Sequence, residues 1–292
     1  MRRDFLYALT SIAAGLLFSA NAQADSFFFS TGNPDDRIAT ATRQASAGKI
    51  ETESADDFIL SRKTQLTGGT FTGLLPDGFS LSGINDVTVE IYRVFPLDST
   101  NPPSRHVPTR NNSPSDNALA SRDSAAGELS FTPALLAADA TAANSVINGI
   151  HAAPNQFTGG EGAVRGEEVQ FSFTFATPLI LEAGHYFFVP QVGIDGSGNF
   201  LWLSAPKPIV APGTPFTPDL QSWIRNEDLA PDWLRIGTDI TGQGPFNAAF
   251  SLVGATVPEP AAWALMILGF AGVGWRARSR AVQEMGTVPI FK

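Results

Sequence analysis

The chain contains no cysteine and only three histidines in 292 residues. The absence of cysteine excludes disulfides, thiolate metal sites and a cysteine nucleophile. The histidines, His106, His151 and His185, lack the spacing of zinc motifs such as HExxH, and there is no GxSxG nucleophile elbow. We therefore expect no cofactor and no catalytic metal. A domain of this size can be stable through its core alone, so the lack of cysteine does not exclude export.

Positive charge is also scarce in the middle of the chain. Between Asp25 and Thr256 there are 13 Lys and Arg against 25 Asp and Glu, which gives a net charge of −12. Because phosphate contacts need Lys and Arg, we expect no nucleic-acid partner. The negative charge itself requires no partner, since it also keeps a protein soluble.

The N-terminus, residues 1–24, has the three parts of a secretory signal peptide. These are the basic residues Arg2 and Arg3, an apolar stretch from Phe5 to Phe18, and the small residues Ala22 and Ala24. We expect signal peptidase to cleave before Asp25. A hydrophobic N-terminal helix of the fold is the alternative. Paired arginines also occur in twin-arginine signals, so the choice between the general and the twin-arginine export route stays open.

A second apolar run, the 15 residues Ala261–Trp275, lies near the C-terminus. As a helix it would be about 22 Å long, which is short of the ~30 Å hydrocarbon core of a bilayer. Arg276, Arg278 and Arg280 follow it and favour the cytoplasmic side. We expect a short transmembrane helix in the inner membrane, with the body outside and residues 281–292 as a cytoplasmic tail.

A known pattern precedes this apolar run. Its residues are Pro258, Glu259, Pro260, Trp263 and Ala264. Together with the apolar run and the arginines, they make residues 257–280 resemble the PEP-CTERM sorting signal in its PEPxxWA form. The resemblance implies recognition by an exosortase, removal of the tail, and delivery to the cell surface or extracellular matrix of a Gram-negative bacterium that makes exopolysaccharide. An ordinary C-terminal membrane anchor is the alternative.

Residues 25–256 show short strand patterns separated by turn signals. The predicted strands are Asp57–Leu60, Gln65–Leu74, Asp86–Phe95, Glu168–Phe175, His185–Val192, Phe200–Ser204, Trp233–Gly237 and Ala248–Gly254. Their alternation of apolar and polar residues predicts an all-β fold, a two-sheet β-sandwich or jelly-roll-like domain. The segments ADDFIL, TFTGLLP, VTVEIYRVF and EAGHYFFV also resemble exported, surface-anchored bacterial β-sandwich proteins, a resemblance that transfers no catalytic residue.

Four local features complete this prediction. The Ala-rich segment Pro133–Val146, with Thr132 as N-cap, predicts one minor helix. The segment Asp195–Asn199 predicts a tight turn within a hairpin. The segment Pro96–Gly127 predicts a long loop, of the kind that is either functional or disordered. The proline-rich segment Ala205–Trp223 predicts an extended strap across a sheet edge.

Three tryptophans are candidates for glycan binding. Trp202, Trp223 and Trp233 lie in the same third of the chain, and an exposed indole face can stack on a sugar ring. Polar neighbours that would bond sugar hydroxyls are Arg225, Asn226 and Asp232. The alternative is that the tryptophans fill the core.

Acidic residues offer two further candidate sites. Asp56 and Asp57 are candidate calcium ligands, with an exposed strand start as the alternative. Asp195, Ser197 and Asn199 alternate as in a calcium loop, but the rest of that loop is missing and a plain turn explains them. Paired carboxylates suit glycoside hydrolysis, for which the candidates are Glu161, Glu167 and Glu168; a solvated loop is the alternative.

Two functions stay open on this basis. The first is a non-enzymatic, exported protein of the cell surface or extracellular matrix, sorted through its C-terminal signal and associated with exopolysaccharide. The second is a secreted, carboxylate-based glycoside hydrolase. The expected partners are signal peptidase, an exosortase-type membrane enzyme and exopolysaccharide, with the inner membrane as a transient location.

Overall fold

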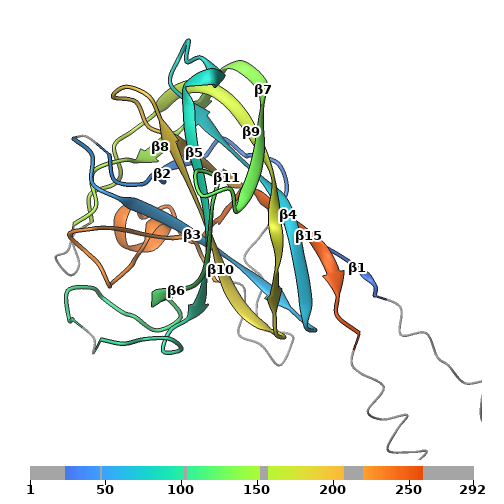
Figure 1. Cartoon of the computed structure of the whole chain (residues 1–292). Helices are drawn as coiled ribbons and strands as arrows, with labels where there is room; N and C mark the ends of the chain where they lie inside the picture. Colours follow the sequence, from blue (N-terminus) through green and yellow to red (C-terminus); the bar gives the residue numbers. More distant parts are fainter. Residues whose placement is uncertain (1–23, 47, 102–103, 152–156, 207–219, 259–292) are drawn as a thin grey trace, which may run out of the picture. The chain divides into compact units, whose positions relative to one another are not determined.

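Strands make up most of the structure, and they form two sheets that face each other (Figure 1). The computed structural model describes residues 24–46, 48–101, 104–151, 157–206 and 220–258, and within it Ser26–Thr256 forms one compact unit. The prediction of an all-β, two-sheet sandwich is therefore confirmed.

The larger sheet has nine strands and is built around β4 (Thr64–Leu75). One side of β4 pairs with β9 (Val164–Leu181), which in turn pairs with β7 (Leu129–Ala142). The other side of β4 pairs with β15 (Phe250–Thr256) and β11 (Leu201–Ala205). The other strands of this sheet are β1 (Ser26–Ser30), β2 (Ile38–Ala41), β8 (Asn144–Val146) and β14 (Asn247–Ala248). In the described part of the sheet, every pair is antiparallel except β2 with β8.

The smaller sheet has six strands with antiparallel pairing. In spatial order they are β13 (Leu234–Arg235), β12 (Trp223–Asn226), β3 (Thr52–Leu60), β10 (Gly184–Ile194), β5 (Ile84–Val94) and β6 (Pro114–Asp123). A 3₁₀ turn, η1 (Leu81–Gly83), leads into β5, and a one-turn π-helix, η2 (Ile236–Ile240), follows β13. Because side chains alternate along a strand, β5 sends Val89 into the space between the sheets and Glu90 to the outer face.

The main hydrophobic core fills the space between the two sheets. Phe188 of β10 stacks on Phe250 of β15 with ring centres 5.0 Å apart, and on Phe173 of β9 at 5.7 Å. Within the larger sheet, Phe71 of β4 stacks on Phe171 of β9 at 4.9 Å. These rings are almost fully excluded from solvent, so their burial holds the two sheets together.

Two glycines of β4 allow its neighbours to approach closely. A Cβ at Gly73 would lie 2.3 Å from the carbonyl oxygen of Leu201 and 2.4 Å from the ring of Phe200. A Cβ at Gly69 would lie 2.0 Å from the carbonyl oxygen of Ser251 on β15. The glycines in the sequence TGGTFTG therefore let β4 pack against both partner strands.

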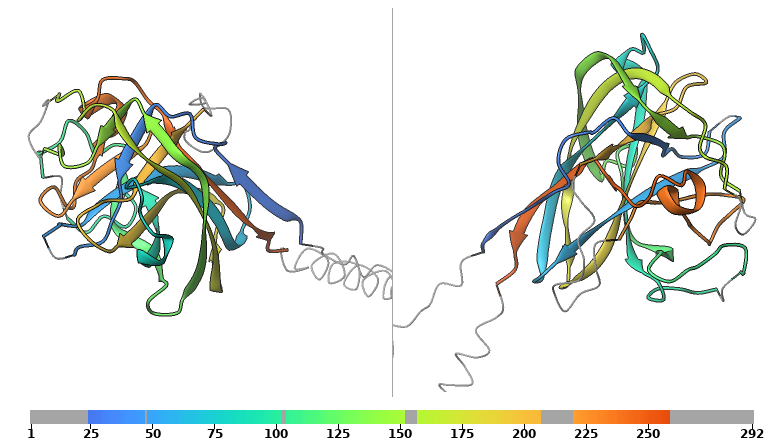
Figure 2. Two further views of the ribbon diagram at one scale, coloured as in Figure 1. Left: turned by 90° about the horizontal axis from the view of Figure 1, so that it is seen from above. Right: turned by 180° about the vertical axis from the view of Figure 1, so that it is seen from behind.

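The first and last strands of the body lie side by side (Figure 2). Ser26 of β1 pairs with Ala255 of β15, and Ser30 pairs with Ser251. The two ends of the sandwich, Ser26 and Thr256, therefore lie next to each other at one end of the same strand pair.

Each predicted strand overlaps an observed strand, although Trp233–Gly237 turns into η2 after Arg235. The alternation in VQFSFTF is confirmed, because Val169, Phe171 and Phe173 are buried while Ser172 and Thr174 are exposed. The strands that the sequence did not indicate are β1, β2, β6, β7, β8 and β12, and the predicted strand Ala248–Gly254 covers one residue of β14 and most of β15.

The predicted helix over Pro133–Val146 is wrong, because β7 and β8 occupy this segment. Phe131 pairs with Phe173 and Pro133 pairs with Phe171 in the ladder between β7 and β9. Helix propensity of an Ala-rich sequence is a weak preference, and tertiary pairing overrides it. Proline is tolerated here because β7, in the described structure, pairs only with β9 and so forms an edge.

The predicted hairpin around Asp195–Asn199 is also wrong. The strand before it, β10, lies in the smaller sheet, whereas the strand after it, β11, lies in the larger one. The turn therefore carries the chain from one sheet to the other, and it delivers Phe200 and Trp202 to the shared core. A hairpin and a crossover need the same turn residues, so local sequence does not distinguish them.

The predicted loop Pro96–Gly127 is correct only in part. Pro114–Asp123 forms β6, which pairs with β5 at the edge of the smaller sheet. This ladder contains two register shifts, so β6 has no regular alternation that a sequence pattern would reveal. The predicted strap Ala205–Trp223 lies largely outside the described residues, which omit 207–219.

Candidate functional site

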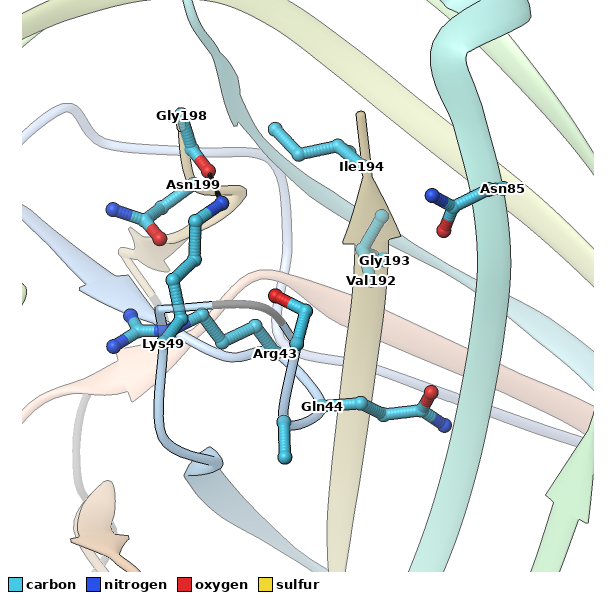
Figure 3. Close-up of a pocket in the computed structure, with 11 residues that line it drawn as sticks. Arg43, Gln44, Lys49, Asn85, Val192, Gly193, Ile194, Gly198 and Asn199 are labelled. Atoms are coloured by element: carbon cyan, nitrogen blue, oxygen red, sulfur yellow. Dashed lines mark hydrogen bonds between the residues drawn. The ribbon is translucent and has the colours of Figure 1, made fainter. Parts of the chain in front are cut away.

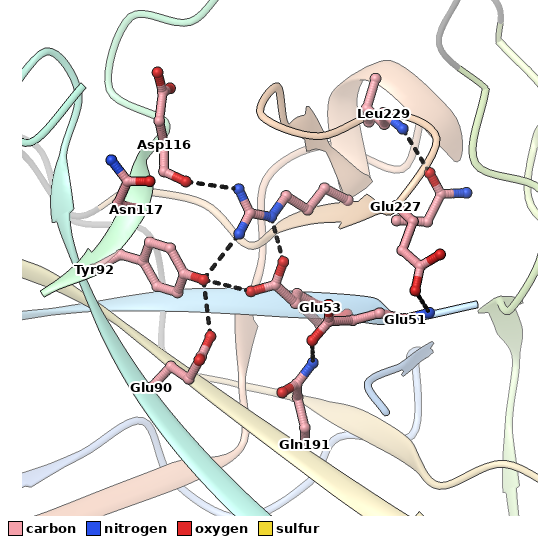
Figure 4. Close-up of polar contacts among 12 residues, drawn as sticks. Glu51, Glu53, Glu90, Tyr92, Asp116, Asn117, Gln191, Glu227 and Leu229 are labelled. Atoms are coloured by element: carbon pink, nitrogen blue, oxygen red, sulfur yellow. Dashed lines mark hydrogen bonds and ion pairs between the residues drawn. The ribbon is translucent and has the colours of Figure 1, made fainter. Parts of the chain in front are cut away.

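A network of charged side chains lies on the outer face of the smaller sheet (Figure 4). Its members are Glu53 of β3, Glu90 and Tyr92 of β5, and Arg225 of β12. Strand alternation places Glu90 and Tyr92 on this face, because Val89 and Ile91 of β5 enter the core. Glu53, Tyr92 and Arg225 are only 5%, 3% and 8% exposed, so the network is buried although it lies outside the core between the sheets.

Tyr92 is the centre of this network. Its hydroxyl oxygen lies 2.6 Å from Glu53 Oε1 and 2.8 Å from Glu90 Oε2, and it accepts a hydrogen bond from Arg225 Nη2 at 2.9 Å. Arg225 also donates through Nε to Glu53 Oε2, and through Nη1 to the carbonyl oxygen of Asp116 at 3.2 Å. Both carboxylate oxygens of Glu53 are therefore occupied within the network.

The protonation of the network follows from these contacts. Tyr92 has a single hydroxyl hydrogen, so it donates to only one of the two carboxyl groups. Burial, with the negative charge of Glu53, raises the pKa of Glu90 to about 7. Glu90 is thus the carboxyl group of the network that takes up a proton below neutral pH. Burial opposes the charge of Arg225, but Glu53 outweighs this effect and raises the pKa of Arg225.

Aromatic rings lie against the guanidinium of the same arginine. The Arg225 guanidinium carbon lies 4.3 Å from the ring centre of Trp233 and 5.2 Å from that of Tyr92. Trp233 and Tyr92 meet edge to face with ring centres 5.5 Å apart. Such cation–π contacts stabilise a guanidinium that is removed from water.

A second group of buried ion pairs lies beside the network. Arg110 contacts Asp116 through Nη2, and its Nε lies 2.7 Å from Asp232 Oδ1. Its guanidinium carbon lies 4.4 Å from the ring centre of Phe95. Burial raises the pKa of Asp232, an effect that the charge of Arg110 opposes. These contacts attach the segment between β5 and β6 to the turn that precedes β13.

Chemically, the network shares a proton among Glu90, Tyr92 and Glu53, and proton sharing is the elementary step of acid–base catalysis. Every oxygen of Glu53 already has a partner within the protein, which is typical of a buried structural network. Within the residues that the structure describes, no group of three or more acidic or histidine side chains is placed to hold a metal ion.

A cavity of about 80 Å³ lies where the turn after β2 meets the turn after β10 (Figure 3). Arg43 and Lys49 line it from the first turn, and Gly198 and Asn199 line it from the second. Sequence reasoning missed this cavity, as it missed the network around Tyr92. The two turns are 150 residues apart in the chain, and an isolated Arg or Lys in a turn is usually solvated.

The three tryptophans do not form a sugar-binding surface. Trp202, Trp223 and Trp233 are 1%, 2% and 1% exposed, so their ring faces are not available to a ligand. Trp202 packs on the rings of Phe188 and Phe250, and its Nε1 donates to the carbonyl oxygen of Ala249 at 2.8 Å. The alternative of buried tryptophans is confirmed: Trp202 lies in the main core, and Trp223 and Trp233 lie in a second buried hydrophobic cluster with Tyr92. Their polar neighbours are buried as well, namely Arg225, Asn226 and Asp232.

The calcium site at Asp56 and Asp57 is not formed. The two residues are adjacent in β3, so their carboxylates point to opposite faces of the sheet. Asp56 accepts hydrogen bonds from Ser222 Oγ at 3.0 Å and from the backbone N–H of Ala248 at 2.9 Å. Asp57 Oδ2 lies 2.5 Å from Nε2 of His185, at the start of β10, so this histidine has a structural role. Both aspartates are buried, so the alternative of an exposed strand start is also wrong.

The three predicted carboxylates are not brought together as a pair. Glu161 accepts hydrogen bonds from the backbone N–H groups of Ile147 and Asn148, so it holds a loop. Glu167 and Glu168 are adjacent in β9 and therefore point to opposite faces of the larger sheet. Burial, with the charge of Asp36, raises the pKa of Glu168. Asp195 accepts a hydrogen bond from Asn85 Nδ2 at 3.0 Å, as part of a plain turn.

Comparison with known proteins gives one match, at the C-terminus. The family model of the PEP-CTERM protein-sorting motif matches residues 256–279. This chain carries a PEP-CTERM sorting motif. The resemblance seen in the sequence is thereby confirmed, and the motif implies export, transit through the membrane and processing by an exosortase. No curated protein and no solved structure matches the chain.

Most residues of the PEP-CTERM motif lie outside the described structure. Pro258 is described, whereas Glu259, Pro260, Trp263, Ala264, Arg276, Arg278 and Arg280 are not. The apolar run Ala261–Trp275 is outside it too, and within the described part no helix is long and apolar enough to cross a membrane. At the other end, Ala24 is described and exposed, while Ala22 is not described; cleavage before Asp25 stays a prediction.

Proposed function

We propose that this protein is a non-enzymatic component of the cell surface or extracellular matrix, which an exosortase releases from the inner membrane after export. One observation carries the proposal: the match to the PEP-CTERM motif begins at Thr256, the residue at which β15 ends. Cleavage after this point removes no strand of the sandwich. The released product is therefore a complete β-sandwich, able to remain folded outside the cell.

The composition of the body supports a role outside the cell. The region from Asp25 to Thr256 has a net charge of −12, and the chain has no cysteine that an oxidising environment would modify. At its final location the protein associates with exopolysaccharide; this part of the proposal rests on the PEP-CTERM resemblance.

The test is fractionation of a host that contains an exosortase. We expect the wild-type body at the cell surface or in the medium. A variant in which Pro258, Glu259 and Pro260 are all replaced by Ala should accumulate in the inner membrane. The substitution Glu284→Gln, in the predicted cytoplasmic tail, serves as the control and should leave sorting unchanged. If the triple variant reaches the surface as well as the wild type does, the sorting proposal fails.

A second candidate function, glycoside hydrolysis, has one observation in its favour. Glu53 and Glu90 approach the same Tyr92 hydroxyl, and the pKa of Glu90 is raised to about 7, as for a general acid. The non-enzymatic proposal expects no release of reducing ends from polysaccharide. Hydrolysis by the wild type that both Glu90→Gln and Glu53→Gln abolish would establish the enzymatic alternative instead.

A further inference from the structure

The cavity between the two turns is lined by a cation, Arg43, that has no counter-ion bonded to it within the described part of the chain. Arg43 is only 6% exposed, and its Nε and Nη1 atoms find no hydrogen-bond partner among the described residues. A buried guanidinium is normally paired, because removing a charge from water is costly. Burial accordingly lowers the pKa of Arg43, although the group stays charged at any physiological pH.

The backbone holds Arg43 in place. Its N–H donates to the carbonyl oxygen of Thr52 at 2.8 Å, and its own carbonyl oxygen accepts from the N–H of Thr52 at 3.0 Å. Gln191 Nε2 donates to the same carbonyl oxygen at 3.3 Å. The guanidinium is thus carried by an anchored strand-like segment, and not by a freely moving loop tip.

A second cation lies beside the first. Lys49 lines the same cavity, and its Nζ donates to the carbonyl oxygen of Gly198. An ammonium group has three donors, so two of them remain for a ligand. Burial, with the positive charge of Arg43, lowers the pKa of Lys49, so the two side chains lie close enough to repel each other. In a body with a net charge of −12, this pairing of cations is a local exception.

Among the residues that the structure describes, no acidic side chain forms an ion pair with Arg43 or Lys49. Glu161 is the carboxylate whose charge opposes the lowering of the Arg43 pKa. Its oxygens, however, accept hydrogen bonds from the backbone N–H groups of Ile147 and Asn148. The donors of Arg43 are therefore left for an acceptor that enters the cavity.

The turn after β10 offers an acceptor. Asn199 lines the cavity, and its Oδ1 is buried with no hydrogen-bond partner among the described residues (Figure 3). A ligand that satisfies both groups must present an anionic acceptor to Arg43 and a donor to Asn199. Inorganic sulfate presents only acceptors at neutral pH, so it satisfies Arg43 alone.

The size of the cavity limits the ligand. Its volume of about 80 Å³ is well above the roughly 10–15 Å³ that one water needs and below the roughly 300–1,000 Å³ of pockets for drug-sized molecules. It accommodates one functional group with its neighbouring carbon, and not a whole sugar ring. Ala45 and Ser46, which also line it, are exposed, so the cavity lies at the surface and the rest of a ligand can remain in solvent.

We propose that this cavity binds an α-hydroxycarboxylate group, with the carboxylate held by Arg43 and Lys49 and the hydroxyl donating to Asn199 Oδ1. Two sources share this chemistry: a free small hydroxy acid such as glycolate, and the acidic end of a sugar acid such as glucuronate. The site belongs to the body alone, so its test is independent of exosortase processing and of the sorting proposal.

The test is calorimetric titration of the full chain in detergent. Glycolate should bind saturably, whereas acetate, which lacks the hydroxyl, should bind about tenfold more weakly. Glucose, which lacks the carboxylate, should not bind. Glucuronate binding alongside glycolate would identify a sugar acid as an accepted ligand, and glycolate binding alone would restrict the site to free small acids; both results support the site.

Two variants and one control make the test specific. Arg43→Met should weaken glycolate binding by about tenfold to a hundredfold while folding at least as stably as the wild type, because it removes an unpaired buried charge. Asn199→Leu should remove the preference for glycolate over acetate. Arg37→Met, at an exposed arginine, should change neither. The proposal is overturned if glycolate does not bind the wild type, if Arg43→Met binds it equally well, or if sulfate binds as tightly as glycolate.

Discussion

The guanidinium carbon of Arg225 lies 4.3 Å from the centre of the Trp233 ring. Arg225 belongs to β12, and Trp233 lies directly before the paired strand β13. From the sequence, Trp233 is a candidate for stacking on a sugar ring and Arg225 for bonding its hydroxyls. In the structure they contact each other, and the carboxylate of Glu53 forms an ion pair with the arginine. The contact therefore stabilises the fold and is closed to a ligand.

Removing this arginine should destabilise the protein strongly. Arg225→Met leaves Glu53 buried without its counter-ion, so we expect a loss of about 3–5 kcal/mol in the free energy of unfolding. Arg93→Met breaks the exposed pair with Asp98, whose side chains are 38% and 32% exposed, and should cost less than about 1 kcal/mol. Urea unfolding of both variants measures the difference. Equal costs would show that the buried pair contributes no more than the surface pair.

Stability should depend on pH through Glu90. Its pKa in the folded state is about 7, above its usual value of 4.5, so the folded protein binds more protons than the unfolded chain between these values. Stability from this group is fully present below pH 4.5 and is lost as the pH rises through 7, with a total loss of about 3 kcal/mol. Urea unfolding at pH 5, 6, 7 and 8 measures this slope.

The isosteric substitution Glu90→Gln isolates this effect. Gln has the shape of Glu and keeps an acceptor for the Tyr92 hydroxyl but does not titrate, so the variant should be more stable than the wild type at pH 8 and should show a shallower slope. A residual slope of the same sign should remain, because burial also raises the pKa of Glu51. A variant with the full slope of the wild type would assign the pH dependence to other groups.

Trp202 should be costly to replace. It is 1% exposed and its Nε1 donates to the carbonyl oxygen of Ala249 at 2.8 Å. Trp202→Phe leaves a small cavity and removes one of the two hydrogen bonds to the Ala249 carbonyl, which keeps the bond from the Thr72 N–H at 3.2 Å, so we expect a loss of about 2–4 kcal/mol by urea unfolding. Phe28→Leu, at a side chain that is 70% exposed, should change the stability by less than about 0.5 kcal/mol. A loss below 1 kcal/mol for Trp202→Phe would contradict its place in the core.

Gly73 should not tolerate alanine. The added Cβ would lie 2.3 Å from the Leu201 carbonyl oxygen, so β4 and β11 would have to separate, at a cost of about 3 kcal/mol or more. Gly127 is the matched control, because its φ of +72° strains alanine but nothing lies within 4 Å of the new Cβ. Gly127→Ala should therefore cost only about 1–2 kcal/mol. Thermal unfolding ranks the two variants, and the reverse order would contradict the close approach of the strands.

The strands of the sandwich were predictable where one face is buried and the other is exposed. In β9, Phe171 and Phe173 alternate with the exposed Ser172 and Thr174, so the sequence carries the pattern directly. The strand β7 was not predictable, because its partner β9 determines its structure and its own Ala-rich sequence favours a helix. The residues of the turn Asp195–Asn199 do not determine whether it forms a hairpin or carries the chain to the other sheet. The outcome depends on where Phe200 packs, and Phe200 packs in the core that both sheets share.

The sorting motif was predictable because all of its elements lie within a short stretch of sequence. The candidate sites of the body were not, because their residues come together only in the fold. At the cavity, Arg43 and Asn199 are 156 positions apart in the sequence. In the network, Glu53 contacts Tyr92 and Arg225, and each of the three residues lies on a different strand of the smaller sheet. The proximity of Glu90 and Tyr92 was present in the sequence VEIYRV, but nothing local indicates that their face of β5 is covered.

Intact mass of the protein recovered from the envelope and medium of a host with an exosortase tests the central claim most directly. We predict a species that begins at Asp25 and ends within the motif, close to Pro258–Pro260, in the surface or medium fraction. A species that ends at Lys292 and stays in the inner membrane would contradict the account, because the tail would then be a permanent anchor and the body would not be released.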